Sequence, residues 1–394
     1  MGRLFSRRKY RDLILGLALL CAVLALMRWP QESMAAARDG LALCGNVIIP
    51  SLFPFFVLSS LVVELGMSRY LGRLLEGVMA PLFRVGGACS SALALGFVGG
   101  YPVGARTAIA LYENGQCSKT EAERLLAFCN NSGPAFILGV VGTGIFASSR
   151  AGLLLYLAHI AASLCVGLLF RFYRPGEGPR PGRHAAPQFQ AASFPVAFTH
   201  SITGALSSTL NICAFVLFFT VVIRMLFLSG VMGALAGGAA ALLSPLGLDQ
   251  AWAQRLITGL LELSSGVSSL TGAGTVTGRL SMAAFMLGWA GISVHCQVLS
   301  FIGGSGLSVG TYLVGKLLHG GLSALFIAVL VRLFPLEAPV SDYLADQVAG
   351  IAGMDFLRTL VISLVCAWVL FLFFLFVAAA AARKSLGKRH RSVL

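Results

Sequence analysis

Two apolar stretches decide the fold, because each is broken in its middle. The first reads ALALGFVGGYPVGARTAIALYENG, from Ala92 to Gly115, and the second reads LLAFCNNSGPAFILGVVG, from Leu125 to Gly142. The first contains a Gly-Gly-Tyr-Pro break, and the second contains Asn-Asn-Ser-Gly-Pro. Glycine permits tight turns, and proline removes a backbone donor and ends a helix. Each stretch therefore predicts two half-helices rather than one plain helix.

The composition places the chain in a membrane. Hydrophobic residues make up 57% of it and charged residues only 11%, whereas soluble domains carry about 25% charged residues. Several apolar runs approach the ~20 residues that cross a hydrocarbon core, and the run from Thr359 to Ala382 contains no charge. The runs are continuous rather than alternating over ~10 residues, which excludes a β-barrel. The sequence thus predicts an all-α polytopic membrane protein.

The net charge of +14 is distributed as in a membrane protein. Basic residues cluster at residues 3–11, 171–183 and 383–391, and each cluster adjoins an apolar run. This is the positive-inside signal and not a nucleic-acid-binding face. Both termini and the central basic segment are therefore expected in the cytoplasm. The stretch 337–346 is acidic and contains no Lys or Arg, which suits the outside.

The second half of the chain repeats the first. Four motifs recur in the same order at a near-constant offset of roughly 160 residues. They are PFFV at Pro54 with LFFT at Leu217, LGFVGG at Leu95 with LELSSG at Leu261, GTG at Gly142 with GSG at Gly304, and LAHIAAS at Leu157 with LLHGGLS at Leu317. We therefore interpret the chain as two related repeats.

The interrupted runs at 89–112 and 250–274 are interpreted as re-entrant hairpins, which return to the side from which they enter. Each repeat then has about three transmembrane helices plus one broken hairpin, so the second repeat is inverted. With an extra helix at each terminus, the total is eight crossings and two hairpins. Inverted repeats with broken elements at the midplane are typical of secondary transporters.

The expected organisation has six segments. Residues 1–39 hold the basic N-terminus and first transmembrane helix, 40–173 the first repeat, 174–194 a Pro/Gly/Arg-rich cytoplasmic linker, 195–335 the second repeat, 336–354 an acidic external loop, and 355–394 the last transmembrane helix and basic tail. The first apolar run could instead be a cleavable signal peptide. We favour an uncleaved helix, because Trp29 resembles an interfacial anchor.

Irregular backbone at membrane depth survives only where protein buries it or where it lines a watery cavity. The first break is thus a candidate anion site, in which the half-helix that follows it offers its N-terminal N–H groups. The candidate substrate-binding residues of the two breaks are Gly99, Gly100, Tyr101, Pro102, Arg106, Asn130, Asn131 and Ser132. Close helix packing is the competing explanation for either break alone.

The second repeat adds Glu262, Ser264 and Ser265 at the matching place. An intramembrane carboxylate is costly and is a functional hypothesis by default. Glu262 could pair with Arg106, carry a coupling proton, or form a fixed salt bridge with Arg255. His295 is a candidate proton relay, and a hydrogen-bonded packing residue is the alternative. His159 and His319 occupy matching positions in the repeats and are interpreted as structural.

Neither a catalytic motif nor a metal-binding pattern competes with this interpretation. There is no GxSxG, Walker or HExxH motif, so no enzyme activity is expected. The nine cysteines lack metal-ligand spacing, so neither a disulfide nor a metal nor any other cofactor is expected. The expected partners are the lipid bilayer, a small anion and a coupling ion, H⁺ or Na⁺, with a homo-oligomer also possible. No nucleic acid is expected.

The segments GFVGGYPVGARTAIALYENG and AERLLAFCNNSGPAFILG, in that order, resemble YlbJ-type sporulation integral membrane proteins. These belong to a larger group with paired nucleoside-recognition, or Gate, domains. The resemblance covers about residues 10–380. It implies transport of dipicolinate, a flat aromatic dianion, out of the mother cell across the outer forespore membrane. A nucleoside transporter, a transporter of another small anion and a non-transporting scaffold of the spore remain the alternatives.

Overall fold

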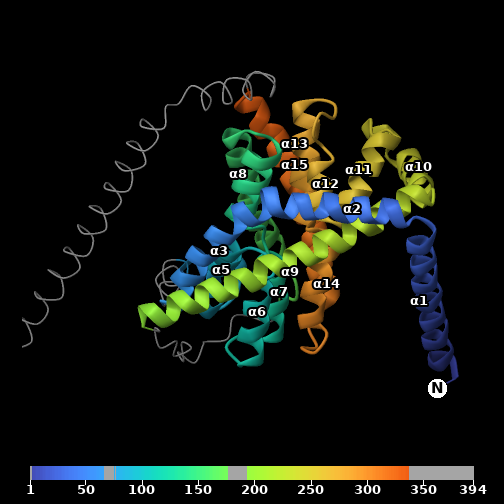
Figure 1. Cartoon of the computed structure of the whole chain (residues 1–394). Coiled ribbons are helices and arrows are strands. Elements are labelled where there is room, and N and C mark those ends of the chain that lie inside the picture. Colours follow the sequence, from blue (N-terminus) through green and yellow to red (C-terminus); the bar gives the residue numbers. More distant parts are fainter. Residues whose placement is uncertain (1, 66–74, 76, 176–192, 337–394) are drawn as a thin grey trace, which may run out of the picture. The chain divides into compact units, whose positions relative to one another are not determined.

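The structure is a computed structural model that describes residues 2–65, 75, 77–175 and 193–336, and every regular element in these residues is a helix (Figure 1). In chain order they are α1 (Gly2–Arg28), α2 (Pro30–Leu43), η1 (Cys44–Ile48), α3 (Ile49–Glu64), η2 (Met79–Phe83), η3 (Gly87–Cys89), α5 (Ser90–Gly99), α6 (Val103–Glu113), α7 (Lys119–Leu126), η4 (Ala135–Ile145), α8 (Ser149–Phe170), α9 (Phe194–Leu228), α10 (Val231–Leu243), η5 (Ser244–Leu246), α11 (Gln250–Leu261), α12 (Leu263–Ser268), α13 (Val276–Trp289), α14 (Gly291–Ile302) and α15 (Val309–Leu333).

Five stretches of the described chain are long and apolar enough to cross a membrane. They are Pro30–Leu58, Ser149–Phe170, Phe194–Leu228, Val276–Ile302 and Val309–Leu333. Large apolar side chains such as Phe218 and Leu325 point outward, as lipid-facing residues do. The predicted all-α polytopic membrane fold is confirmed. The predicted last transmembrane helix and nearly all of the linker and the acidic loop lie outside the described residues.

Both interrupted runs form helical hairpins. Helix α5 packs against α6 in the first half, and α11 packs against α12 in the second. Figure 1 shows α6 and α7 at the lower end of the described part and α10 and α11 at the upper end. Helices α7 and η4, with the break between them, correspond in order to α13 and α14. Helix α8 corresponds to α15, and the pair α2–α3 corresponds to α9, beside which it packs.

The apolar run from Leu280 to Phe301 could form one helix by its composition alone, but the structure divides it into α13 and α14. Ala290 and Gly291 separate the two with positive φ angles of 86° and 81°. A non-glycine residue rarely adopts this left-handed conformation. The second half therefore has the same two interruptions as the first, one in its hairpin and one in the helix pair that follows.

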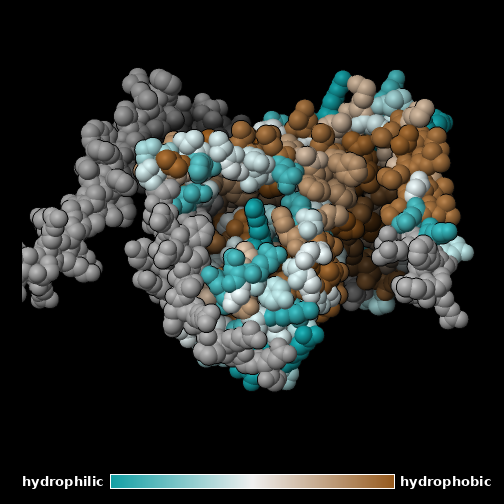
Figure 2. Space-filling view, turned by 90° about the horizontal axis from the view of Figure 1, so that it is seen from below, coloured by the Kyte–Doolittle hydropathy of each residue, from teal (hydrophilic) through white to brown (hydrophobic). Residues whose placement is uncertain are grey.

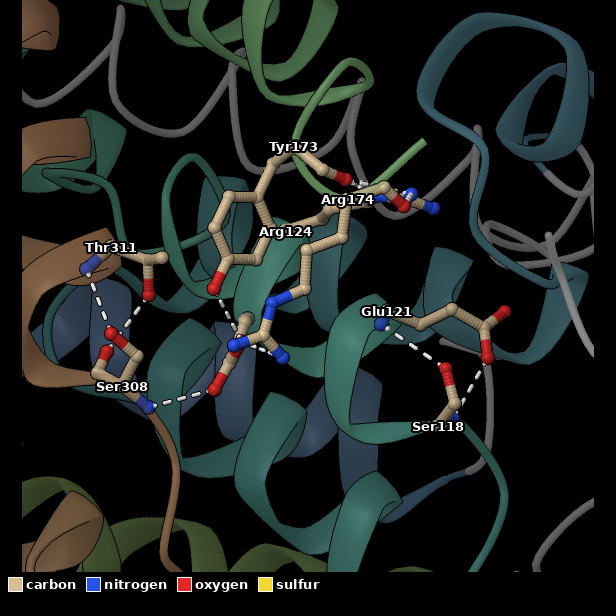
Figure 3. Close-up of polar contacts among 8 residues, drawn as sticks. Ser118, Glu121, Arg124, Tyr173, Arg174, Ser308 and Thr311 are labelled. Atoms are coloured by element: carbon tan, nitrogen blue, oxygen red, sulfur yellow. Dashed lines mark hydrogen bonds and ion pairs between the residues drawn. The ribbon is translucent and has the colours of Figure 1, made fainter. Parts of the chain in front are cut away.

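A buried polar cluster on α7 joins the two halves of the chain at one end of the fold (Figure 3). The Arg124 guanidinium donates to the carbonyl oxygens of Tyr173, Arg84 and Arg174 at distances of 2.7–3.0 Å. The neighbouring Glu123 carboxylate accepts from the Tyr173 hydroxyl at 2.9 Å and from the Ser308 backbone N–H at 3.0 Å. Helix α7 thus fixes the end of α8 to the start of α15.

Figure 2 shows the fold from the end that lies lowest in Figure 1, where α6 and α7 lie. Hydrophilic side chains gather near the centre of this view, and hydrophobic surface lies beside them. A protein that crosses a membrane exposes such a pattern, because its polar end residues meet water while its flanks meet lipid. We therefore expect the α6–α7 and α14–α15 turns to face the same aqueous compartment. The start of α8 and the α12–α13 turn should face the other.

This topology predicts a pattern of cysteine accessibility. Asn114→Cys and Gly304→Cys should react with a membrane-impermeant maleimide from the cytoplasm, because the adjoining basic segments place this end inside. Ser149→Cys and Thr271→Cys should react only from the opposite side. All four positions are exposed, and labelling of the unsubstituted chain is the control. Reaction of Asn114→Cys and Ser149→Cys from the same side would contradict the inverted arrangement.

Candidate functional site: a cavity between broken helices

The site is built from four interruptions of helices. The first half is interrupted between α5 and α6 and again between α7 and η4. The second half is interrupted at Glu262, whose backbone is extended (φ −142°, ψ 123°), and at Ala290. Each interruption leaves backbone N–H and C=O groups without helical partners. Inside a membrane, these groups need hydrogen-bond partners from protein, water or a ligand, because lipid offers none.

The two interruptions of the first half contact each other directly. Gly100 has a φ of 71°, and a Cβ atom added to it would lie 2.9 Å from the Gly133 nitrogen. Gly96 and Gly104, on the two arms of the hairpin, enclose the Cys129 carbonyl so closely that a Cβ at either position would collide with it. Only glycine lets the hairpin tip approach the second break this closely.

The second half is built in the same way. A Cβ atom added to Gly291 would lie 3.1 Å from the Leu263 nitrogen, so the α13–α14 break touches the α11–α12 break. Gly259 and Gly266 lie in direct backbone contact on the two arms of this hairpin. Two pairs of touching interruptions, one from each half, therefore lie within the described fold.

A cavity lies where the two pairs meet. Its apolar wall comes from α3, η4 and α9 and includes Leu52, Phe56, Phe136, Ile212 and Phe215. Its polar lining comes from the breaks and α14 and includes Gly100, Tyr101, Ser132, Glu262, Ser264, Ser293 and Gln297. An apolar pocket with a few convergent polar groups is the usual form of a small-molecule site.

Five of the predicted substrate-binding and coupling residues line this cavity. They are Gly100, Tyr101, Ser132, Glu262 and Ser264. Gly99 and Pro102 flank the first break but do not line the cavity. Their predicted roles in binding remain predictions, since the structure contains no ligand.

Asn130 and Asn131 lie buried beside the cavity rather than in its wall. The Asn131 amide donates to the Phe128 carbonyl at 2.9 Å, and the Asn130 amide donates to the Tyr312 hydroxyl at 3.4 Å. The side-chain oxygens of both residues and the Ser132 hydroxyl have no hydrogen-bond partner within the described residues. Buried polar atoms rarely lack partners, so this region has unused capacity to bind a polar group.

Glu262 caps the short helix that follows it. Its two carboxylate oxygens accept from the backbone N–H groups of Ser264 and Ser265 at 2.9 and 2.6 Å. The side chain is buried. Neither of the ion pairs considered for it from the sequence occurs: the structure records none with Arg106 or Arg255, and Arg255 instead donates to the Ser269 carbonyl at 3.1 Å.

Arg106 does not line the cavity. Its side chain is exposed, and the guanidinium carbon lies 5.9 Å from the ring centroid of Phe301 on α14. The neighbouring Gly104, Ala105 and Ala108 form the buried face of α6, so Arg106 lies on the opposite face. A direct contact between Arg106 and a substrate in this cavity has no support from this arrangement.

Lys316 on α15 is a central charged residue that the sequence interpretation missed. It is 1% exposed, and its Nζ atom donates to the Asn130 carbonyl at 2.9 Å and to the Tyr101 hydroxyl at 3.1 Å. The signal was present in the sequence, because a lysine interrupts the apolar run from Val309 onward, and intramembrane charges are usually functional.

One histidine contacts this lysine directly, and two more belong to the same buried polar network. His319 lies 3.4 Å from Lys316 Nζ through its Nδ1 atom, and its Nε2 atom lies 3.0 Å from the His159 carbonyl. His159 Nε2 accepts from the Ser132 N–H at 3.0 Å. The predicted relay residue His295 does not line the cavity, and its Nδ1 atom lies 3.0 Å from the Tyr312 hydroxyl.

A second, more polar cavity adjoins the first. Its lining includes Asp39, Thr220, Arg224, Arg255, Ser265 and Ser269. Ser264 lines the central cavity while Ser265 lines this one. The predicted substrate residue Ser265 therefore faces the second cavity, where its hydroxyl lies 3.3 Å from that of Thr220.

The described helices adopt a fold that is also found in solved structures. Two solved structures of variants of CNTnw, a concentrative nucleoside transporter, share it. The intermediate 3 state has a TM-score of 0.53 at 15% identity and covers 84% of this chain and 87% of that chain. The intermediate 2 state has a TM-score of 0.53 at 19% identity and covers 74% and 76%.

The sequence comparisons define the family. The Gate family, described as nucleoside recognition, matches residues 47–174. The sporulation integral membrane protein YlbJ of Bacillus subtilis (strain 168) is 31% identical over 344 residues, which is 82% of this chain and 83% of that protein. The chain belongs to the YlbJ family of sporulation integral membrane proteins. The family resemblance inferred from the two broken stretches is confirmed.

The contact between Gly100 and Gly133 predicts a measurable cost of substitution. Gly100→Ala should lower the apparent unfolding temperature in detergent by about 5 °C more than Gly115→Ala. Gly115 is a matched control, because its φ is 69° but nothing lies within 4 Å of an added Cβ atom. The difference between the two variants reports the collision together with the cost of the Gly100 backbone, whose ψ of −163° favours glycine. Equal shifts would show that the two breaks are not in contact.

Proposed function

We propose that this protein is a secondary transporter that moves a small dicarboxylate, dipicolinate, through the central cavity. The observation that carries the proposal is the meeting of broken helices from both halves of the chain around that one cavity. Broken helices at the interface of two repeats form the substrate sites of many secondary transporters. The choice of dipicolinate comes from the resemblance to sporulation membrane proteins.

The chemistry of the cavity suits a small flat acid. Phe56, Phe136 and Phe215 supply apolar faces for an aromatic ring. The hydroxyls of Ser132 and Ser293 and the amide of Gln297 supply hydrogen-bond donors for carboxylate oxygens. Ser132 is 1% exposed, and its buried hydroxyl is without a hydrogen-bond partner in the described chain.

Glu262 supplies the coupling step of this mechanism. A dianionic substrate and an ionised Glu262 would repel each other in a partly apolar cavity. Protonation of Glu262 removes this repulsion and leaves the carboxyl group able to donate to the substrate. One proton would therefore travel with each substrate molecule, which makes the transporter proton-coupled.

A nucleoside is the second candidate substrate, and one observation favours it. The cavity wall contains a carboxylate but no arginine or lysine among the described lining residues. An ionised Glu262 would accept hydrogen bonds from the hydroxyl groups of a sugar. The matching Gate family is described as nucleoside recognition, and the CNTnw structures share the fold.

The direction of transport completes the proposal. With both termini in the cytoplasm of the mother cell, the protein would release dipicolinate across the outer forespore membrane toward the spore. The structural neighbours are transporters, and we propose no catalytic activity.

Substrate choice is tested with purified protein in liposomes. We expect saturable uptake of dipicolinate, with picolinate at least about tenfold weaker, because one charge-assisted carboxylate contact is worth more than 1.4 kcal/mol. Uridine should not compete. Competition by uridine with no effect of dipicolinate would instead establish the nucleoside alternative. In cells, spores of a strain that lacks this protein should contain less dipicolinate than spores of the parent strain, and re-expression of the chain should restore it.

Glu262→Gln tests the proton step. The amide cannot carry a coupling proton, so uptake should no longer respond to an imposed pH gradient, while exchange of labelled for unlabelled dipicolinate should continue. Glu113→Gln is the matched control, because Glu113 is exposed at the end of α6, and it should behave as the parent does. Full stimulation by the pH gradient in folded Glu262→Gln would remove Glu262 from the coupling step.

A further inference from the structure

We propose that the Lys316 ammonium group is a tethered cation that permanently occupies a cation site between the two broken segments of the first half. A protein with this arrangement binds no free Na⁺ or K⁺ at that place, and its transport is independent of both ions. The inference goes beyond the proposed substrate, because the occupancy of the site can be measured without any substrate.

The geometry places one positive group between two interruptions of the backbone. Lys316 Nζ donates to the Tyr101 hydroxyl at the hairpin tip and to the Asn130 carbonyl in the second break. Its third neighbour is His319 Nδ1 at 3.4 Å. An ammonium has three donors, and three acceptors surround this one.

One of these acceptors, the Asn130 carbonyl, is of the kind that binds metal cations in broken-helix transporters. Unwound backbone carbonyls and the C-terminal ends of half-helices attract Na⁺ in such proteins. Helices α5 and α7 both end beside this site, and the C-terminal end of a helix carries partial negative charge. Within the described residues no carboxylate lies within 4.0 Å of Lys316. The lysine therefore balances carbonyl and helix-end dipoles and not an acidic side chain.

The surrounding packing is built to bring the lysine to this place. Gly315 precedes it, and a Cβ atom added there would lie 2.5 Å from the Ala127 carbonyl oxygen. Helix α15 consequently approaches the end of α7 closely enough for Lys316 to reach Asn130. The Nζ atom also lies 4.9 Å from the ring centroid of Tyr101, which adds a cation–π contact.

The cation belongs to one repeat only. At the offset that aligns His159 with His319, Lys316 aligns with Tyr156. Tyr156 packs against the apolar cluster that contains Leu263 and Met286. The first half thus has a neutral residue at the matching position, and that residue packs against the second-half segments that follow the Glu262 carboxylate.

The test measures thermal unfolding of the purified chain in detergent, in NaCl, KCl or choline chloride at about 0.15 M. The parent should unfold at the same temperature in all three salts. Lys316→Ala should unfold roughly 5 °C or more lower in choline chloride, and Na⁺ or methylammonium should recover at least half of the loss, because the vacated acceptors can bind a small cation. Choline is too large to enter.

Two further variants separate charge from volume. Lys316→Met keeps the length of the side chain but removes the charge and fills the site, so it should be destabilised and should not respond to any small cation. Lys119→Ala removes an exposed lysine on α7 and should match the parent. Stabilisation of the parent by Na⁺ over choline, or absence of any cation response in folded Lys316→Ala, would overturn the proposal.

If Lys316→Ala does not fold, the parent and Lys316→Met decide the question. A salt-independent parent together with a destabilised, unresponsive Lys316→Met supports the tethered cation. A parent that requires Na⁺ for stability or for uptake refutes it. Failure of dipicolinate uptake would count against the proposed substrate alone, because the unfolding measurements contain no substrate.

Discussion

Backbone polar groups at membrane depth must find partners inside the protein, because lipid offers none. This constraint organises the described part of the fold. Each half of the chain breaks twice, and each break is placed against the other break of the same half. Gly100 meets Gly133 in the first half, and Gly291 meets Leu263 in the second. The two interruptions of each half share one protected region. The cavity forms where the region of the first half meets that of the second.

The two halves satisfy the constraint with different chemistry. The first half uses glycine, proline and neutral polar residues, and its breaks hold no charged side chain of their own. Its positive charge arrives from α15 as Lys316, which binds the Asn130 carbonyl. The second half carries a charged residue in its own break, because the Glu262 carboxylate accepts hydrogen bonds from two backbone N–H groups there. The carboxylate of Glu262 and the ammonium group of Lys316 therefore both come from the second repeat, although they contact different halves of the site.

Local residue chemistry explains what could be predicted from the sequence. The breaks of the first half were predictable because glycine, proline and asparagine are poor in helix interiors and rare together in apolar runs. The Ala290 break was missed because Trp289-Ala290-Gly291 contains no proline and only one glycine. Lys316 was missed because the run around it is long enough to be a plain span. Arg106 was predicted to line the site because it lies close to Pro102 along the chain. Which face of α6 is buried depends on the packing of Gly104 and Ala108, and Arg106 lies on the other face.

Only a short segment of chain, beside the Glu262 break, separates the two cavities. Ser264 lines the central cavity and Ser265 lines the second one, so the first turn of α12 separates them. That turn is held by Glu262 through its two backbone contacts. At the opposite end, α7 is anchored by buried Glu123 and Arg124, which bind the ends of α8 and α15. A charge change at Glu262 acts on a six-residue helix, whereas α7 is held by several buried hydrogen bonds. A contact that protonation of Glu262 would alter therefore lies at the boundary between the two cavities.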